Sequence, residues 1–481
     1  MNRSKPCQVL IVGGGPSGLA MALLLIERGW RDVVLLERRG SADEFERGKA
    51  FNYQLDGRGQ SILERVGITV DILQRFGLPN DRFTQMVFEP DGRFVKRVFP
   101  ALLPGRKTPY WMTRAHMLEM LQTRLEEKNA MGAVSVMYGA TLRGLQRDGD
   151  VLCAAVHADD GGLTHYTPRL IVACDGLGSA VRSALVEFAS NDNKDDFAMN
   201  AYPSPSAELA YKVLSFPSVI DVAGSERSAS DHTLAYCFLS RYKEVERRMA
   251  LFALPVPHAD DARNINIILH RSHAFWQLKS AEAIKLWLED CFPQLDFDAL
   301  LPEEELEGFA ALQPACFPNP QHANRVHFAS GTGDTAADVV LLGDSAHAFP
   351  PDLGMGVNAA LEDVAILDDA LSACCGDVRS ACENFESRRL PENRALVRLV
   401  QTVHPYQYNQ VPWRLKLWFL KFLCQRQIHR LSRGLIPQPP FVLSQIHDLN
   451  FVEMERRAKL SNGALYGVLL SCVAVLLLVF N

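Results

Sequence analysis

The chain has 481 residues, of which 48% are hydrophobic and 22% are charged. These proportions are those of an ordinary globular protein, so they exclude a largely disordered chain, a collagen-like chain and a protein with many membrane spans. The net charge of −6 gives no indication that the chain binds nucleic acid. That charge is unevenly spread: residues 388–462 hold 13 Lys or Arg and four Asp or Glu, a net of +9, which leaves −15 on the rest of the chain.

A glycine-rich turn near the N-terminus predicts a nucleotide site. The apolar run 8–12 predicts a strand, Gly13-Gly14-Gly15-Pro16-Ser17-Gly18 a tight turn, and residues 19–27 a helix. In such a βαβ opening, the glycines allow the tight turn, the approach of a pyrophosphate and close helix packing. Glu37, at the end of the second predicted strand, is placed to accept a hydrogen bond from a ribose hydroxyl. We therefore expect FAD or NAD, because an acid here disfavours the 2′-phosphate of NADP.

The middle of the chain alternates between helical and strand patterns. Helices are predicted at 59–66 and 114–128, and strands at 151–156 and 170–173. Asp175-Gly176 follows the last of these strands and precedes a helix start. From about residue 208 to 270, short alternating apolar runs predict an antiparallel sheet that would cover a ligand. A sheet inserted between two α/β stretches indicates a split nucleotide-binding domain with a lid.

Gly343-Asp344 repeats this arrangement after a short buried strand predicted at 339–342. Asp344 is placed to accept from a ribityl hydroxyl, and residues 354–358 open a helix whose free N–H groups would face a ring carbonyl or a phosphate. Each Asp alone is equally well explained as a helix N-cap. The three turns in this order are far more specific and favour a flavin. His347 and Glu362 are expected to have structural roles rather than to react.

The C-terminal part is predicted to be helical and to end in a membrane anchor. Helices are expected at 379–400 and 411–431, and residues 463–480 contain no charge. As a helix these 18 residues span roughly 27 Å, enough for a hydrocarbon core. The basic residues before them are placed to meet anionic head groups: Arg456, Arg457 and Lys459. A buried core helix is the alternative, but the segment has no polar face. The body is then expected on the cytosolic side of the mitochondrial outer membrane or the endoplasmic reticulum.

Together the three glycine motifs resemble those of the single-component FAD-dependent aromatic hydroxylases. The resemblance covers the whole chain and implies an α/β fold: a Rossmann-type FAD-binding domain with an inserted antiparallel substrate lid, a C-terminal helical region and one transmembrane helix. The expected parts are FAD-binding segments at 1–190 and 306–375, the lid at 191–305, the basic helical region at 376–462 and the tail anchor at 463–481.

The resemblance also implies the chemistry and the cofactor contacts. NADPH or NADH binds transiently and reduces FAD, O2 adds to give a C4a-hydroperoxyflavin, and one oxygen atom passes to a small aromatic substrate. No catalytic side chain and no metal site are expected. The FAD-binding residues are expected to be Gly13, Gly15, Ser17, Gly18, Glu37, Arg38, Arg114, Asp175, Gly176, Gly343, Asp344, Pro351, Gly354, Gly356, Val357 and Asn358.

Within this family the chain is most similar to the kynurenine-hydroxylating branch, in residues 49–59, in residues 356–363 and in the layout of the tail. It departs from that branch at the substrate. The carboxylate-binding Arg of the branch falls on Gln85, and Gln cannot form the two parallel charged hydrogen bonds that Arg forms. The substrate-binding candidates are therefore the aligned residues and their possible replacements: Arg82, Gln85, Phe99, Tyr110, Phe317 and Tyr406.

Two other functions fit the same motifs. One is a flavin-dependent epoxidase or reductase for an isoprenoid or other apolar lipid, because aromatic residues such as Phe317 and Trp418 would suit an apolar channel. The other is a membrane-tethered flavin-binding module without catalysis. The sequence contains no indication of the oligomeric state.

Overall fold

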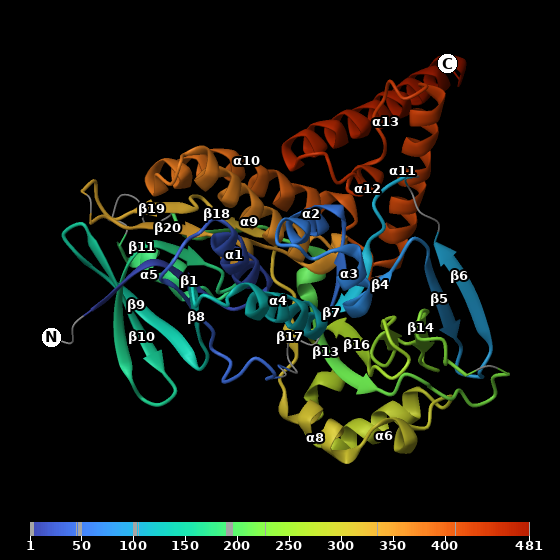
Figure 1. Ribbon diagram of the computed structural model, residues 1–481. Coiled ribbons are helices and arrows are strands. Elements are labelled where there is room, and N and C mark those ends of the chain that lie inside the picture. Colours follow the sequence, from blue (N-terminus) through green and yellow to red (C-terminus); the bar gives the residue numbers. More distant parts are fainter. Residues whose placement is uncertain are drawn as a thin grey trace.

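The described residues form two large sheets with their helices, two small sheets and a group of C-terminal helices (Figure 1). The structure is a computed structural model, and it describes residues 4–44, 46, 51–99, 103, 105–188, 196–226, 228–333, 335–408 and 410–480. The α/β fold with an inserted sheet, expected from the order of the elements, is confirmed.

The first sheet is parallel at its centre and carries the three glycine motifs. The parallel strands lie in the order β20 (Asp338–Leu341), β11 (Leu163–Ala173), β1 (Lys5–Val12), β2 (Val33–Leu36) and β8 (Val134–Met137). Antiparallel additions are β19 (His327–Ala329) at the β20 edge, and β10 (Val151–Ala158) with β9 (Ala140–Asp148) on β11. The central strands are apolar on both faces, as a sheet covered by helices requires. Three motifs far apart in the sequence thereby leave neighbouring strands at the same edge.

Helices cover the parallel sheet. Two of them contact its strands, α1 (Pro16–Glu27) and α5 (Ala180–Phe188), and four pack against α1 or against one another: α2 (Gly57–Arg65), α3 (Val70–Phe76), α4 (Arg114–Lys128) and α9 (Gly356–Ala373). The helix α1 packs against both α4 and α9, and the residues from Ser17 to Leu25 are buried. Because α1 is enclosed in this way, its sequence is apolar around the whole circumference. Its N-terminus is consequently held firmly beside the glycine-rich turn.

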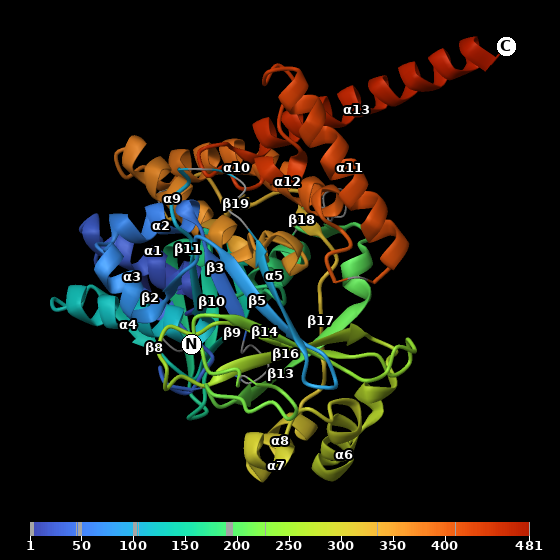
Figure 2. The same cartoon turned by 90° about the vertical axis from the view of Figure 1, so that its right-hand side faces the viewer.

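The second sheet has seven strands, and Figure 2 shows it on one side of the molecule with α6–α8 beneath it. The order is β17 (Ala315–Cys316), β13 (Leu209–Phe216), β16 (Arg263–His270), β15 (Ala250–Ala253), β14 (Ala235–Leu239), β5 (Phe83–Phe88) and β6 (Phe94–Phe99). The helices are α6 (Ala281–Cys291), α7 (Phe297–Leu300) and α8 (Glu303–Ala311). The expected lid range, 191–305, provides four of these strands; β5, β6 and β17 come from outside it.

One pairing in this second sheet differs from the expected antiparallel pattern. The strand β5 runs parallel to β14, so that Gln85 lies opposite Ala235 in the register. The hairpin β5–β6 has apolar residues at Met86 and Phe88 that are buried in the core of the second sheet. Because Met86 and Phe88 are buried there, the β5–β6 hairpin pairs with the second sheet although it lies in the N-terminal part of the sequence. Two small sheets complete the set. One pairs β3 (Asn52–Leu55) and β4 (Leu78–Pro79) with β7 (Tyr110–Thr113), and the other consists of β12 (Met199–Ala201), β18 (Gln321–Ala323) and β21 (His347–Ala348).

The C-terminal region consists of four helices: α10 (Val378–Val403), α11 (Pro412–Leu431), α12 (Pro440–Leu443) and α13 (Phe451–Phe480). The last helix begins well before the expected tail at 463. Phe451, Met454 and Ala458 on its first half are buried against α10 and α12. Its second half projects away from the body (Figure 2). The most apolar window of α13 is only 11% buried, and within the described residues this is the one helix long and apolar enough to span a membrane.

Several basic residues before the tail are already paired inside the protein. Arg456 and Arg457 both bind Glu453, at 2.5 and 2.7 Å, and Lys459 binds Glu455 at 2.7 Å. These pairs lie on the surface and are individually weak. They nevertheless offset part of the positive charge that the sequence suggests for head groups. The exposed basic residues Arg426, Arg430 and Arg433 lie instead on and after α11.

Candidate functional site

Two of the motif glycines are required by packing, and a third leaves space. Gly13 has a φ of +106°, and a Cβ there would lie 2.4 Å from the carbonyl oxygen of Cys174 at the end of β11. A Cβ on Gly18 would lie 1.9 Å from the carbonyl oxygen of Gly13. Within the part of the chain that the structure describes, no atom lies within 4 Å of a Cβ placed on Gly15. The turn is thus tightly closed on the protein side and open where a ligand would approach.

Among the described residues, two helices that follow glycine motifs begin without a side-chain cap. The helix α1 starts after Gly15, and α9 starts at Gly356, where again nothing lies within 4 Å of a Cβ position. The first N–H groups of a helix have no intrahelical acceptor, and the helix dipole makes this end electropositive. Both helices therefore suit negative groups, a pyrophosphate at α1 and a ring carbonyl at α9.

Glu37 is buried at the end of β2 and is held by backbone donors. Its Oε2 accepts from the N–H of Gly14 at 2.8 Å, and its Oε1 accepts from the N–H of Arg39 at 2.9 Å. Each oxygen retains a second lone pair for a ribose hydroxyl. The predicted contacts Arg38 and Arg114 both pair with one acid, Glu46, each at 2.8 Å. Sequence reasoning missed Glu46, and nothing in its local pattern distinguishes it from other surface acids.

Asp175 has an unsatisfied acceptor. Its Oδ2 accepts from the N–H of Val181 at 3.2 Å, whereas its Oδ1 is buried and has no hydrogen-bond partner among the described residues. Burial raises the pKa of this carboxyl. Arg182, on the helix that follows, donates to the carbonyl of Ser345 at 2.8 Å and so ties the second motif to the third. A ligand hydroxyl or N–H would satisfy Asp175 Oδ1.

The third motif rests on a buried ionic network. The N–H of Gly343 donates to Asp363 Oδ2 at 2.6 Å, and His347 Nε2 lies 2.9 Å from the same oxygen. Arg389 pairs with the other oxygen of Asp363 and with Glu362. Although burial opposes it, Arg389 and His347 hold the pKa of Asp363 below its usual range. His347 thus hydrogen-bonds to Asp363 and Glu362 pairs with Arg389, and both contacts support the loop.

Asn358 is committed to the backbone of a distant strand. Its Nδ2 donates to the carbonyl of Gln54 at 2.8 Å, and its Oδ1 accepts from the N–H of Asp56 at 3.0 Å. These bonds join α9 to β3. The side chain therefore positions the start of α9, and contact with a cofactor falls to backbone N–H groups there. Pro351 and Gly354, in the loop before α9, complete the predicted cofactor set, together with Ser17, Gly176 and Val357.

The structure spreads the six substrate candidates over separate parts of the chain. Gln85 and Phe99 lie on the β5–β6 hairpin, Arg82 is exposed just before it, and Tyr110 is buried in β7. Tyr406 follows α10, and its hydroxyl accepts from Arg414 at 2.9 Å. The ring of Phe317 stacks with that of Tyr211 at 5.2 Å and lies 5.5 Å from that of Tyr408.

Residues that the motif search missed connect this aromatic group to the cofactor side. Tyr53, on β3, interacts electrostatically with Arg114, Asp344 and Tyr211. Tyr53 thus interacts with Asp344 of the third motif and with Tyr211, whose ring stacks with that of Phe317. We call Tyr53, Tyr211, Phe317 and Tyr408 the aromatic wall. Tyr53 lies within residues 49–59, the segment noted for its similarity to the family, so an available signal pointed to it.

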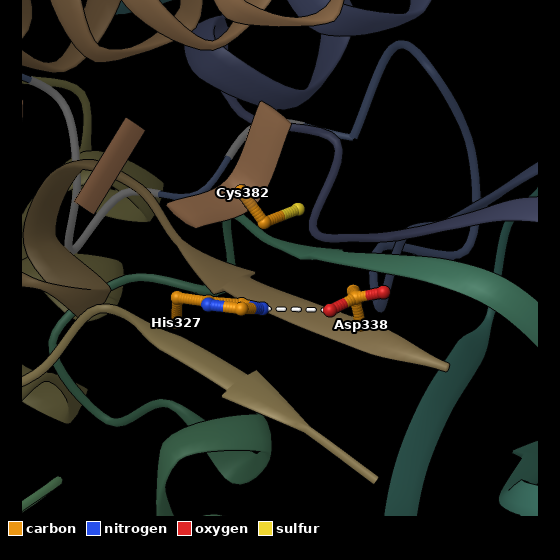
Figure 3. Close-up of side chains that lie close together, drawn as sticks. All are labelled: His327, Asp338 and Cys382. Atoms are coloured by element: carbon orange, nitrogen blue, oxygen red, sulfur yellow. Dashed lines mark hydrogen bonds and ion pairs between the residues drawn. The ribbon is translucent and has the colours of Figure 1, made fainter. Parts of the chain in front are cut away.

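A possible metal-binding group lies behind the sheet. His327 on β19, Asp338 on β20 and Cys382 on α10 offer ligand atoms within 4.8 Å of one another (Figure 3). Asp338 Oδ1, however, accepts from His327 Nε2 at 2.7 Å and from Arg379 Nε at 2.6 Å. Burial raises the pKa of Cys382 well above its usual value, which disfavours the thiolate that binds metals. With a guanidinium on its carboxylate, the group is a buried ion pair.

Comparisons with known proteins agree with this geometry. A family model described as "FAD binding domain" matches residues 6–208 and 321–400. The chain is 27% identical over 446 residues to a kynurenine 3-monooxygenase of Salinispora tropica, covering 91% of this chain and 87% of that protein. A kynurenine 3-monooxygenase of Sus scrofa is 23% identical over 433 residues, covering 89% and 81%.

Solved structures share the fold. PqsL, a probable FAD-dependent monooxygenase from Pseudomonas aeruginosa, superposes with a TM-score of 0.55 at 20% identity, covering 86% of this chain and 100% of that one. A tetrameric 2-methyl-3-hydroxypyridine-5-carboxylic acid oxygenase has a TM-score of 0.57 at 18% identity, covering 92% and 96%. At these identities the likeness concerns the fold.

Proposed function

Because the chain belongs to the FAD binding domain family, we propose that it hydroxylates a small aromatic substrate, with NADPH as the electron donor. It is a flavin-dependent monooxygenase that resembles kynurenine 3-monooxygenase and uses FAD and O2. The observation that carries the proposal is that the three glycine motifs are in contact: a Cβ on Gly13 would lie 3.0 Å from Asp175 Cα, and a Cβ on Gly343 would lie 3.5 Å from Ser17 Oγ, on the first turn of α1.

The residues of the chain then have separate tasks. We assign the pyrophosphate to the N-terminus of α1 beside Gly15, and the ribose to Glu37. Asp175 and Asp344 supply acceptors for hydroxyl groups, and the backbone at Gly356 and Val357 faces the ring. Bound FAD supplies the oxygen-transfer chemistry once NADPH has reduced it. The protein contributes orientation and a site from which water is excluded.

The substrate is proposed as a kynurenine-like aromatic compound rather than as kynurenine itself. The Salinispora and Sus relatives are named for kynurenine, and PqsL has been solved with 2-aminobenzoylacetate. These proteins are named as oxygenases of small aromatic compounds or simply as a monooxygenase, and none is named as a lipid epoxidase, a reductase or a module without catalysis, so they give no support to those alternatives. Gln85, on β5 between β14 and β6, offers an amide where a charged carboxylate partner was expected.

Membrane attachment is proposed through the second half of α13. The adjoining helix α11 supports it, since large apolar side chains are exposed there: Trp413, Leu417, Phe419, Leu420 and Leu423. Exposed Arg426, Arg430 and Arg433 lie along the same region, so α11 combines apolar and basic surface as interfacial helices do. The cytosolic face of the mitochondrial outer membrane or the endoplasmic reticulum remains our proposal for the location. Deleting residues 463–481 is expected to move most of the protein from the membrane pellet to the supernatant.

The function is tested on the purified full chain. We expect an oxidised flavin spectrum with about one FAD per chain, and NADPH oxidation that a kynurenine-like aromatic compound accelerates. The products should contain one oxygen atom from labelled O2. If an isoprenoid accelerates NADPH oxidation and no aromatic compound does, the proposal fails. Normal FAD content in Asp344→Ala would contradict the assigned role of the third motif.

A further inference from the structure

Asp352 is a buried carboxylate with an unsatisfied oxygen. It lies in the short 3-10 turn Pro351–Leu353, immediately before α9, and it is 2% exposed. Its Oδ1 accepts from the hydroxyl of Ser206 at 2.7 Å. Its Oδ2 is buried and has no hydrogen-bond partner among the described residues. Burial of a charged acceptor without a donor is costly, so this oxygen requires an explanation.

A second unsatisfied acceptor belongs to the same cluster. Gln410, in the connection between α10 and α11, donates through Nε2 to the hydroxyl of Ser206 at 2.9 Å. Its Oε1 is buried and, in the part of the chain that the structure describes, lacks a donor. Asp352 and Gln410 are thus joined through Ser206, and each has one oxygen free. Two free acceptors in one cluster match a ligand that donates hydrogen bonds.

The cluster adjoins an aromatic wall that leads to the cofactor side. Tyr408 interacts electrostatically with Asp352, and its ring centroid lies 5.5 Å from that of Phe317. Phe317 stacks on Tyr211, which interacts with Tyr53 beside Asp344. Aromatic faces of this kind bind the ring of an aromatic ligand by stacking. Acceptors at one end and the third motif at the other would fix such a ring relative to the flavin.

The charge of the cluster restricts the ligand. Burial raises the pKa of Asp352 to about 7, with the Ser206 hydroxyl opposing it, and Tyr408 is the titratable neighbour seen to interact with it. A carboxylate on a substrate brings acceptors and no donor to these two oxygens, and it is also repelled when Asp352 is charged. An amine would donate to both acceptors, and a hydroxyl would donate to one of them.

We propose that Asp352 and Gln410 bind the amine or hydroxyl group of a neutral or cationic aromatic substrate whose ring lies against Phe317 and Tyr408. The inference rests on the proposed monooxygenase function and adds the substrate class. The cluster is a binding site that selects donor-bearing rings over ring carboxylates. Ser206 is a positioning residue, because it touches both acceptors and orients them.

The test uses the FAD-loaded full chain and three probes with one ring substituent each: aniline, phenol and benzoate. Binding is followed by the change in the absorption of bound FAD. We expect aniline and phenol to perturb the flavin and benzoate to bind most weakly. Asp352→Leu should raise the Kd for aniline about ten- to a hundredfold, the effect of losing a hydrogen bond to a charged group. Asp352→Asn should tighten benzoate relative to the unmodified protein, because it removes the like charge.

The control is Asp221→Asn, an exposed Asp outside this cluster, which should leave all three Kd values unchanged. FAD content and melting temperature are measured for every variant, and Asp352→Asn serves where Asp352→Leu fails to fold. The proposal is overturned if benzoate binds most tightly, or if aniline and phenol bind equally well to a flavin-loaded Asp352→Asn and the unmodified chain. Failure of the unmodified chain to bind FAD would instead overturn the proposed function.

Discussion

The sequence predicts the nucleotide-binding sheet in more detail than it predicts the C-terminal helices. At the sheet, each motif residue has a geometric task that no other residue type performs: a Cβ on Gly18 would lie 1.9 Å from a backbone oxygen. In the C-terminal helices, the informative feature is a composition, basic and apolar, which many arrangements satisfy. The glycine motifs therefore predict particular atomic contacts, whereas the composition of the C-terminal helices predicts only a general property of that region.

The charges of the C-terminal region illustrate the difference. Arg389 and Arg457 contribute equally to the net charge of residues 388–462. Arg389 is 1% exposed and holds Asp363 beneath the third motif, whereas Arg457 lies on the surface with Glu453. The first belongs functionally to the cofactor region, and neither is a free charge for a membrane. Net charge thus overstates what this region offers to lipid head groups.

The largest effect is expected from the motif glycines. Gly18→Val should abolish FAD binding and reduce folding, because its side chain would overlap the backbone of Gly13. Gly15→Ala should fold normally, since its Cβ meets no protein atom, and yet lose most of the FAD. Flavin-to-protein ratio and the melting temperature without FAD separate the two cases. Gly144→Ala, in β9 with open space around it, is the matched control and should change neither.

The next effect is expected from the buried ion pair. Arg389→Leu should destabilise the protein by about 3–5 kcal/mol, because Asp363 and Glu362 would lose their shared guanidinium partner in the interior. The measurement is urea unfolding of the FAD-free protein. Arg456→Leu, which removes a surface pair, should cost under about 1 kcal/mol. Equal losses for the two variants would contradict the distinction between buried and surface charges drawn above.

A smaller effect should distinguish free from paired basic residues. Replacing Arg426, Arg430 and Arg433 by Glu should weaken binding to anionic lipid vesicles, by about 1 kcal/mol for each charge near the surface. The same change at the exposed Arg143 in β9 should leave vesicle binding unaltered. Cosedimentation of the chain lacking residues 463–481 with these vesicles measures the contribution of the three arginines without that of the tail. Unchanged binding of the triple variant would exclude α11 from the membrane surface.

A separate effect concerns pH. Burial lowers the pKa of His404 to about 4. The ring lies 4.1 Å from that of Trp418 at the junction of α10 and α11. The unfolded chain takes up a proton near pH 6.5, whereas the folded chain does not until about pH 4. The stability contributed by neutral His404 is therefore complete above pH 6.5 and is lost as the pH falls toward 4. His404→Phe should flatten this part of the profile in unfolding measurements, and an unchanged profile would contradict it.

The sequence predicted much of the cofactor side. The strand, turn and helix around residues 8–27 agree with β1 and α1, and the expected helix at 114–128 has the bounds of α4. The helix α10 begins one residue before its expected start at 379 and continues to Val403. Patterns of this kind are local, since each depends on residues a few positions apart.

The substrate side was much less predictable. The β5–β6 hairpin gives no local sign that it will leave the nucleotide domain and pair with β14, about 150 residues later. The cluster of Asp352, Ser206 and Gln410 joins residues 146 and 204 positions apart. Sequence reasoning passed over Asp352 although it directly follows Pro351, because a lone Asp in a loop is most often solvated.

The sequence by itself determined that this chain has a split nucleotide fold, a flavin-type set of glycine turns and an apolar tail, because tight turns, helix packing and membrane thickness each restrict residue type at fixed spacing. Only the tertiary structure decided which charges are paired, where α13 begins and which acceptors remain without donors. Those outcomes depend on burial, and burial is set by contacts between segments that are remote in the chain.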